Sequence, residues 1–290
     1  MAHQHAETID PFVPALVVTG ALVLIKVVGA ILAHSLALAA DAVHSLGDTG
    51  ALALALYADR QKRRPPTLQF TFGWGRVEVL VALLNALVLW IIAGGLATEA
   101  IRDWIHPPTA DSGLMLVVAA LGMGVNFALL RRVHREHDLN QQATWWHLLS
   151  DILSSLSVLV AALVLMLTGW RAANAAATLV IAVLIVVSAW GVIREAVGVL
   201  LEATPHDIAV DRLILDMESV PGVHRVHDLH LWAIGSHQWA LSCHVSLNEA
   251  ENVSPQTILC ELHDRIQAYG VQHTTIQLET ADEGHPEPAW

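Results

Sequence analysis

Long hydrophobic runs dominate the first part of the chain, and short polar segments separate them. Most of these runs reach the roughly 20 apolar residues that a helix needs to cross the hydrocarbon core of a bilayer. We therefore predict an all-α membrane domain with six spans. The predicted spans are Pro14–Leu32, Leu36–Tyr57, Val77–Ala97, Leu114–Leu130, Trp145–Thr168 and Ala172–Ile193.

The pattern changes after Pro205, where amphipathic and alternating segments replace the long apolar runs. Alternation predicts strands, and Ser254-Pro255 has the form of an N-cap followed by proline at the first helical position. The predicted elements are helix 207–219, strands 223–233 and 238–247, helix 255–269 and strand 273–280. This α-β-β-α-β order fits a small α+β domain with its helices on one face. We expect a transmembrane domain over residues 1–204 and a cytoplasmic domain over residues 205–290.

Composition supports this division. Hydrophobic residues make up 54% of the chain and charged residues 14%, against roughly 25% charged in soluble domains. The net charge of −12 comes largely from the tail, which argues against a nucleic acid partner. Cys243 and Cys260 give no disulfide framework and fit a reducing compartment. The N-terminus has no basic region, so the first run is expected to be a retained helix rather than a cleaved signal.

Basic residues alternate between the loops. They are frequent between the second and third spans and between the fourth and fifth, whereas the opposite loops contain Arg102 and Arg171. Because basic residues favour cytoplasmic loops, both termini are predicted to be cytoplasmic. The two basic loops contain Arg60, Lys62, Arg63, Arg64, Arg76, Arg131, Arg132 and Arg135.

Two identical pairs of histidine and aspartate occur in the predicted spans: His44 with Asp48, and His147 with Asp151. Residues four apart share one face of a helix. Polar caps on interfacial helices would explain one such pair, but two favour a metal site, since ionisable groups at membrane depth mark ion pathways. The pairs lie on oppositely directed spans, so the fifth helix either begins before Trp145 or is drawn inward. Together they would supply four ligands, as a tetrahedral zinc-like ion requires.

Other polar and small residues surround these pairs. Asp41 lies about one turn before His44 and either supports an imidazole from outside the ligand set or caps the start of the helix, the supporting role being favoured. Lys26 is expected to pair with a carboxylate such as Asp41 or to extend toward the interface. Gly47 and Gly50 would admit close helix packing.

The chain resembles the cation diffusion facilitator family of zinc and other divalent metal transporters. The segments that carry the resemblance extend over nearly the whole chain. They are Ser35–Asp48, Phe70–Glu78, His147–Asp151, Leu200–Pro205 and His273–Glu279. The resemblance implies a homodimer of six-helix subunits, each with a metallochaperone-like cytoplasmic domain, which exports metal in exchange for protons and is not an enzyme.

By position in the family pattern, His44, Asp48, His147 and Asp151 would form the transport site. Histidine in the second-span pair is associated in this family with zinc. Phe72-Gly-Trp74-Gly contains no histidine, so an extra metal site found there in some relatives is not expected. The short segment between the fourth and fifth spans favours a multi-pass protein of the bacterial plasma (inner) membrane.

The ligand chemistry agrees with this interpretation. Imidazole and carboxylate suit zinc, cobalt and related ions, whose affinity order does not assign the metal. Ligands must lose protons to bind metal, and imidazoles titrate near neutrality, so metal and protons can compete for one site. The sequence contains no phosphate-binding Gly-x-x-x-x-Gly-Lys-Ser/Thr loop, which favours proton antiport over ATP-driven pumping. No resident cofactor is required, and Zn²⁺ is expected as substrate and as a regulatory ligand.

Nine histidines lie in the tail. Solvated surface histidines would explain any one of them, but the group predicts at least one regulatory metal site, with His227 and His244 as the best candidates and Glu279 as a weaker one. Strand alternation predicts that His227 and Asp228 face opposite sides, and that Cys243 faces the core. The nine are His206, His224, His227, His230, His237, His244, His263, His273 and His285.

Three functions other than zinc export are alternatives for this chain. An intramembrane zinc hydrolase would offer His-Glu-x-x-His on one helix, and His134-Arg-Glu136-His137 has the wrong spacing and lies in a predicted loop. A non-transporting metal sensor or assembly protein on the same scaffold would have the same ligands. An exporter specific for cobalt, cadmium or manganese is the third.

Overall fold

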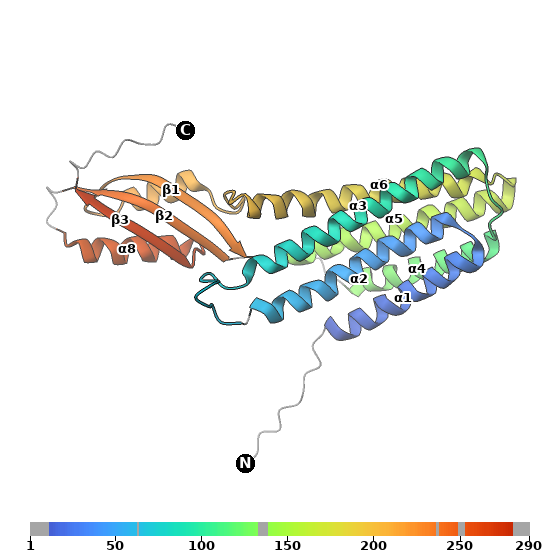
Figure 1. Ribbon diagram of the computed structural model, residues 1–290, viewed down its shortest axis with the longest axis horizontal. Coiled ribbons are helices and arrows are strands. Elements are labelled where there is room, and N and C mark those ends of the chain that lie inside the picture. The colour runs from blue at the N-terminus through green and yellow to red at the C-terminus, as the bar shows by residue number, and fades with distance from the viewer. Residues whose placement is uncertain (1–11, 63, 133–138, 236–237, 249–252, 281–290) are drawn as a thin grey trace, which may run out of the picture. The chain divides into compact units, whose positions relative to one another are not determined.

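The computed structural model describes residues 12–62, 64–132, 139–235, 238–248 and 253–280 (Figure 1). Six long helices come first, and a mixed α/β segment follows. The helices are α1 (Phe12–Ala33), α2 (Leu36–Lys62), α3 (Gly75–Ile105), α4 (Ser112–Arg132), α5 (Leu139–Thr168) and α6 (Ala172–Leu200). The later elements are α7 (Val210–Glu218), β1 (Val223–Gly235), β2 (Gln238–Leu247), α8 (Pro255–Ala268) and β3 (His273–Thr280). The predicted fold class is confirmed.

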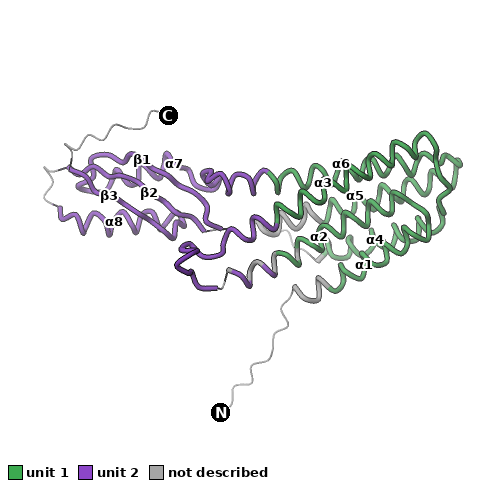
Figure 2. The backbone as a smooth tube through the Cα atoms, viewed as in Figure 1, with its two compact units in different colours: residues 1–56, 82–193 green, residues 57–81, 194–290 purple. Residues whose placement is uncertain are grey.

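The chain forms two compact units (Figure 2). The first contains residues 1–56 and 82–193, and the second contains residues 57–81 and 194–290. The second unit thus combines the tail with the ends of the long helices and the connection between α2 and α3.

Within the described part of the chain, four helices are long and apolar enough to cross a membrane: α3, α4, α6 and the part of α5 from Leu148 to Thr168. Among the described residues, α1 adds a shorter apolar stretch, Val17–Ala33. The helices of this unit pack through small buried residues, including Ala33, Ala37 and Ala162. Small side chains let helix backbones approach closely where lipid removes the hydrophobic drive for association.

Several helices extend past the predicted apolar runs. α5 begins at Leu139, which confirms the expectation that it starts before Trp145. α2 continues to Lys62, and α3 and α6 continue to Ile105 and Leu200. The apolar run marks only the part that suits hydrocarbon, whereas backbone hydrogen bonding continues into the polar ends.

The tail forms a three-stranded sheet in the order β1-β2-β3, in which β1 and β2 are antiparallel and β2 and β3 are parallel. α8 provides the crossover that a parallel pair requires, and the Ser254 hydroxyl caps it by accepting from the Thr257 amide at 3.2 Å. Buried residues of α7 and α8 share one core with the sheet, so both helices cover one face. Cys243 is buried in that core, as predicted.

Candidate metal sites

α2 and α5 bring three of the predicted transport-site residues together. His44, Asp48 and Asp151 each offer a ligand atom, and these atoms all lie within 4.8 Å of one another. His44 Nε2 lies 3.6 Å from Asp151 Oδ1 on α5 and 4.0 Å from Asp48 Oδ2 one turn along α2. The Ser150 hydroxyl lies 3.3 Å from the same imidazole nitrogen. Imidazole and carboxylates at this spacing form a donor set suited to a zinc-like ion.

His147, the fourth predicted ligand, belongs to α5, but its side chain lies outside the described part of the structure. The helix backbone places position 147 one turn before Asp151. Residues at this spacing lie on the same face of a helix.

A second polar cluster lies one helical turn from these residues. Lys26 of α1 and Asp41 of α2 are fully buried, and Lys26 Nζ lies 2.9 Å from Asp41 Oδ2, which confirms the expected pairing. Ser154 and Ser155 of α5 donate to the Asp41 carboxylate at 2.7 and 3.4 Å. Asp41 contacts Lys26 and two serines in the second turn of α2, so the alternative of a cap at the helix start is wrong. Ser35 holds that position instead, accepting from the Leu38 amide. The favoured role, support of an imidazole from outside the ligand set, stays a prediction.

Gly47 lies where α2 approaches α3. A Cβ built on Gly47 would lie 2.7 Å from the side-chain methyl groups of Leu89, so this position has room only for glycine unless Leu89 moves. Gly50 has more space, since the nearest atom to its Cβ position is Asn85 Oδ1 at 3.5 Å. Close packing at Gly47 is therefore confirmed.

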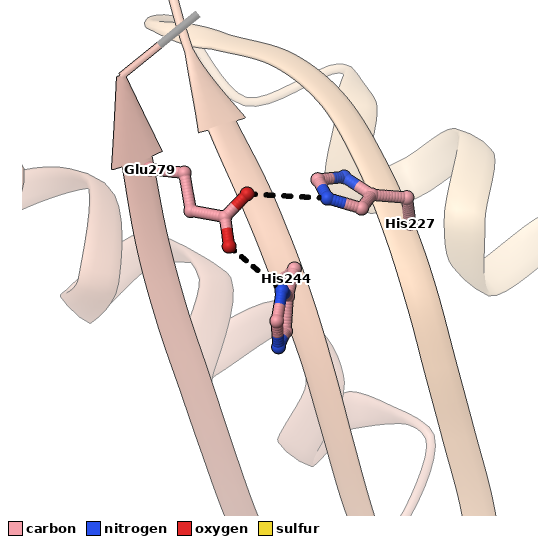
Figure 3. Close-up of side chains that lie close together, drawn as sticks. All are labelled: His227, His244 and Glu279. Carbon is pink, nitrogen blue, oxygen red and sulfur yellow. Dashed lines mark ion pairs between the residues drawn. The ribbon is translucent and has the colours of Figure 1, made fainter. Parts of the chain in front are cut away.

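The tail contains a second group of metal-ligating side chains, drawn in Figure 3. Glu279 of β3 accepts from both histidines: its Oε2 lies 3.2 Å from His227 Nε2, and its Oε1 lies 2.7 Å from His244 Nδ1. His227 and His244 are paired across β1 and β2. Glu279 is nearly inaccessible to solvent, while both histidines are partly exposed. Glu279 is thus the residue that joins the two histidines.

Asp228 belongs to the same neighbourhood, and the prediction that it lies on the opposite side from His227 is wrong. Its Oδ2 lies 3.9 Å from His244 Nε2, and its Oδ1 lies 3.1 Å from His230 Nε2. The cause is a bulge in β1: His227 pairs with His244, but the next pair is His230 with Ser242, so β1 has an extra residue. Asp228 has a φ of +48° at this point. A bulge interrupts the alternation of side chains between faces.

The other tail histidines have separate surroundings. His263 Nδ1 lies 3.1 Å from the Thr274 hydroxyl, and the His273 ring packs edge-on against Phe72 at 5.2 Å. His206 and His224 are exposed. His237 and His285 lie outside the described residues, as does the segment 133–138, which contains His134 and His137.

The serines beside the intramembrane residues and the aspartate in the bulge were not predicted from the sequence. Ser154 and Ser155 follow Asp151 by three and four positions, the spacing that places residues on one helix face. That signal was available for the serines. No sequence pattern indicated the bulge at Asp228.

Residues 13–201 match the family described as "Cation efflux transmembrane domain", and residues 205–281 match "Cation efflux protein, cytoplasmic domain". The zinc transporter ZitB of Escherichia coli K12 is 35% identical over 294 residues, covering 96% of this chain and 93% of that protein. A "cadmium, cobalt and zinc/H(+)-K(+) antiporter" of Bacillus velezensis is 34% identical over 275 residues, covering 93% and 88%. The metal cation efflux system protein CzcD of Cupriavidus metallidurans is 35% identical over 270 residues, covering 92% and 85%.

Proposed function

The chain belongs to the cation diffusion facilitator family of zinc and divalent metal transporters, and we propose that it exports Zn²⁺ from the cytoplasm in exchange for protons. Its function is metal cation efflux, and it is a multi-pass membrane protein and not an enzyme. The names of its relatives include zinc, cadmium and cobalt. Zinc is the proposed cargo because imidazole and carboxylate together suit this ion.

The proposed transport site consists of His44, Asp48, His147 and Asp151. The observation that carries it is the 3.6 Å approach of His44 Nε2 to Asp151 Oδ1, which joins α2 to α5 at a buried position. Placing ionisable side chains inside a membrane bundle costs free energy. A bound divalent cation would neutralise the negative charge of the two carboxylates. His147 would supply the fourth ligand from the turn before Asp151.

Proton exchange follows from the chemistry of these ligands. A metal binds the deprotonated forms of imidazole and carboxylate, and its departure leaves basic groups that can accept protons. If the site faces each side of the membrane in turn, metal leaves on one side and protons return from it. Metal and protons then occupy the site in turn. Their movements are coupled when only the occupied site changes sides.

The tail site would sense metal rather than carry it. His227, His244 and Glu279 form a partly exposed group on the sheet, where zinc could bind from the cytoplasm. We also propose a homodimer in the bacterial plasma (inner) membrane, with both termini in the cytoplasm. The cytoplasmic-domain match at residues 205–281 supports this arrangement.

Flux measurements test the proposal. The full chain is reconstituted in proteoliposomes with a set pH gradient, and uptake of zinc, cadmium, cobalt, manganese and nickel is measured together with proton movement. We expect zinc flux with opposite proton flux. A protein that binds zinc but moves neither zinc nor protons would instead be a metal sensor or assembly protein. Faster flux of cobalt, cadmium or manganese than of zinc would reassign the cargo.

A further inference from the structure

A buried polar cluster lies beside the proposed transport site and contains none of its ligands. It consists of Lys26, Asp41, Ser154 and Ser155, from α1, α2 and α5. The Lys26 ammonium donates to Asp41 Oδ2 at 2.9 Å, to the Ser45 hydroxyl at 2.8 Å and to the Ser155 hydroxyl at 3.4 Å. An ammonium group has three donors, so its hydrogen bonding is complete without water.

The position of this cluster relative to the ligands follows from two contacts. His44 contacts Asp151, and Asp41, three residues earlier on α2, contacts Ser154, three residues later on α5. α2 and α5 therefore run antiparallel, and the cluster lies one turn from the ligands toward the start of α2 and the end of α5. By the predicted orientation this is the outer side of the site.

Side-chain exposure changes across the site in the same direction. Asp41, Ser154 and Ser155 are 0% exposed. The His44 side chain is 4% exposed, and the Asp48 side chain, one turn further from the cluster, is 26% exposed. The described helices thus enclose the cluster completely, and side-chain exposure increases from the cluster through His44 to Asp48.

α4 leaves space for this cluster. A Cβ built on Gly122 would lie 3.0 Å from Lys26 Cε and 3.4 Å from the Ser155 hydroxyl oxygen. The Lys26 side chain thus lies where α1, α2, α4 and α5 meet. A separation of α2 from α5 at this level has to break its hydrogen bonds.

We propose that Lys26, Asp41, Ser154 and Ser155 form a latch that closes the outer side of the transport site and opens when metal is bound. This inference rests on the proposed site. Lys26 donates to Ser45, the residue after His44, so a divalent cation at the site would lie near the ammonium group. Like charges repel strongly in a desolvated interior, and binding of the cation would loosen the latch. Water entering on opening can replace its hydrogen bonds, which makes the opening reversible.

The test uses a cysteine reporter beyond the latch. Val158 is fully buried and lies one turn past Ser154 on α5. Val158→Cys is introduced into the full chain with Cys243→Ala and Cys260→Ser, and a membrane-impermeant maleimide is added outside spheroplasts. In this reporter protein we expect zinc to raise the labelling rate about tenfold, because the ratio of open to closed latch would rise by the same factor.

The latch variant is Lys26→Met with Asp41→Asn, which removes both charges together and leaves neither one buried alone. We expect fast labelling that zinc no longer changes, with zinc binding retained because the four ligands are intact. The matched control is Arg102→Met with Glu99→Gln, which removes an exposed ion pair on α3. The control should label as the reporter does. Ser154→Ala, which removes one hydrogen bond to Asp41, provides a milder variant if the double variant does not fold.

Three results would overturn the latch. The reporter could label at one rate with and without zinc, the latch variant could label as slowly as the reporter, or the folded latch variant could lose zinc binding. The last result would mean that the cluster only shapes the ligand set. Absence of zinc flux in the wild-type chain would instead contradict the transport function, and the labelling rates without zinc would still report on the latch.

Discussion

Two groups of histidine and carboxylate residues in this chain have similar chemistry but different supports. In the helical unit, two helices hold His44, Asp48 and Asp151; in the tail, three strands hold His227, His244 and Glu279. The helical group has a buried polar cluster on one side, whereas both tail histidines are partly exposed. A site with one sealed side suits alternating access, and a site on a sheet surface suits equilibrium sensing.

The largest effect is expected from the helical group. Asp151→Ala removes one of four proposed ligands. Replacing a residue that only contacts a metal ligand lowers metal affinity or activity ~10–100-fold. Loss of a ligand itself should therefore reduce zinc flux by more than about 100-fold. Asp48→Ala should behave in the same way. Flux in proteoliposomes and thermal unfolding are measured together, and we expect little loss of folding in either variant.

Ser157→Ala is the matched control on α5, because its hydroxyl bonds to the Leu153 carbonyl of its own helix. This variant should transport zinc at the wild-type rate. Zinc flux retained in Asp48→Ala or Asp151→Ala would place the transport site elsewhere in the chain.

From the sequence, His44 and Asp48 could be placed on one helix face, whereas the position of Asp228 in the tail was predicted wrongly, and the reason is geometric. In a helix, residues four apart always share a face, so His44 and Asp48 had to lie together. The partner face of α5 was harder to predict, since lipid-facing and core-facing residues are both apolar and leave the rotation of a helix undetermined. In the tail, one extra residue at Asp228 interrupts the alternation of side chains between the two faces of β1, and the predicted side of Asp228 depended on that alternation.

A smaller effect is expected from the tail group. Glu279→Gln keeps the size of the side chain but removes the charge that both histidines contact, so zinc affinity at the tail should fall ~10–100-fold. Zinc stoichiometry of the purified full chain is measured by calorimetry. We expect two classes of site in the wild-type protein, with the tail class missing in Glu279→Gln and the helical class missing in Asp151→Ala.

Glu261→Gln is the control for the tail, because Glu261 contacts Arg265 one turn along α8 and no tail-site histidine among its described partners. Its zinc stoichiometry should match that of the wild-type protein. If Glu279→Gln instead abolished flux at saturating zinc, the two groups would not be functionally separate.

The bulge in β1 offers a third comparison. Asp228 has a φ of +48°, which aspartate and asparagine tolerate and β-branched residues do not. Asp228→Val should therefore destabilise the tail by about 1–3 kcal/mol and weaken zinc binding there by turning His227 away from Glu279. Asp228→Asn keeps the backbone conformation and removes only the charge. Denaturant unfolding monitored by tryptophan fluorescence, with zinc titration, distinguishes them: equal loss of stability in both variants would contradict the backbone explanation.

The smallest expected effect is on the rate at which a maleimide labels the two cysteines, both of which belong to the tail. Burial raises the pKa of the Cys243 thiol to about 12, so almost none of it is thiolate at pH 8, and Cys260 is exposed. A maleimide should therefore label one thiol in the native chain, and label Cys243 only when the tail opens.

Zinc at about ten times its Kd for the folded tail should slow the labelling of Cys243 about tenfold, equivalent to about 1.4 kcal/mol. Glu279→Gln should remove the zinc effect and Asp151→Ala should keep it, because Cys243 and His244 are neighbours on β2 that face the core and the metal site respectively. Zinc protection that depended on Asp151 and not on Glu279 would show that the helical group controls the tail.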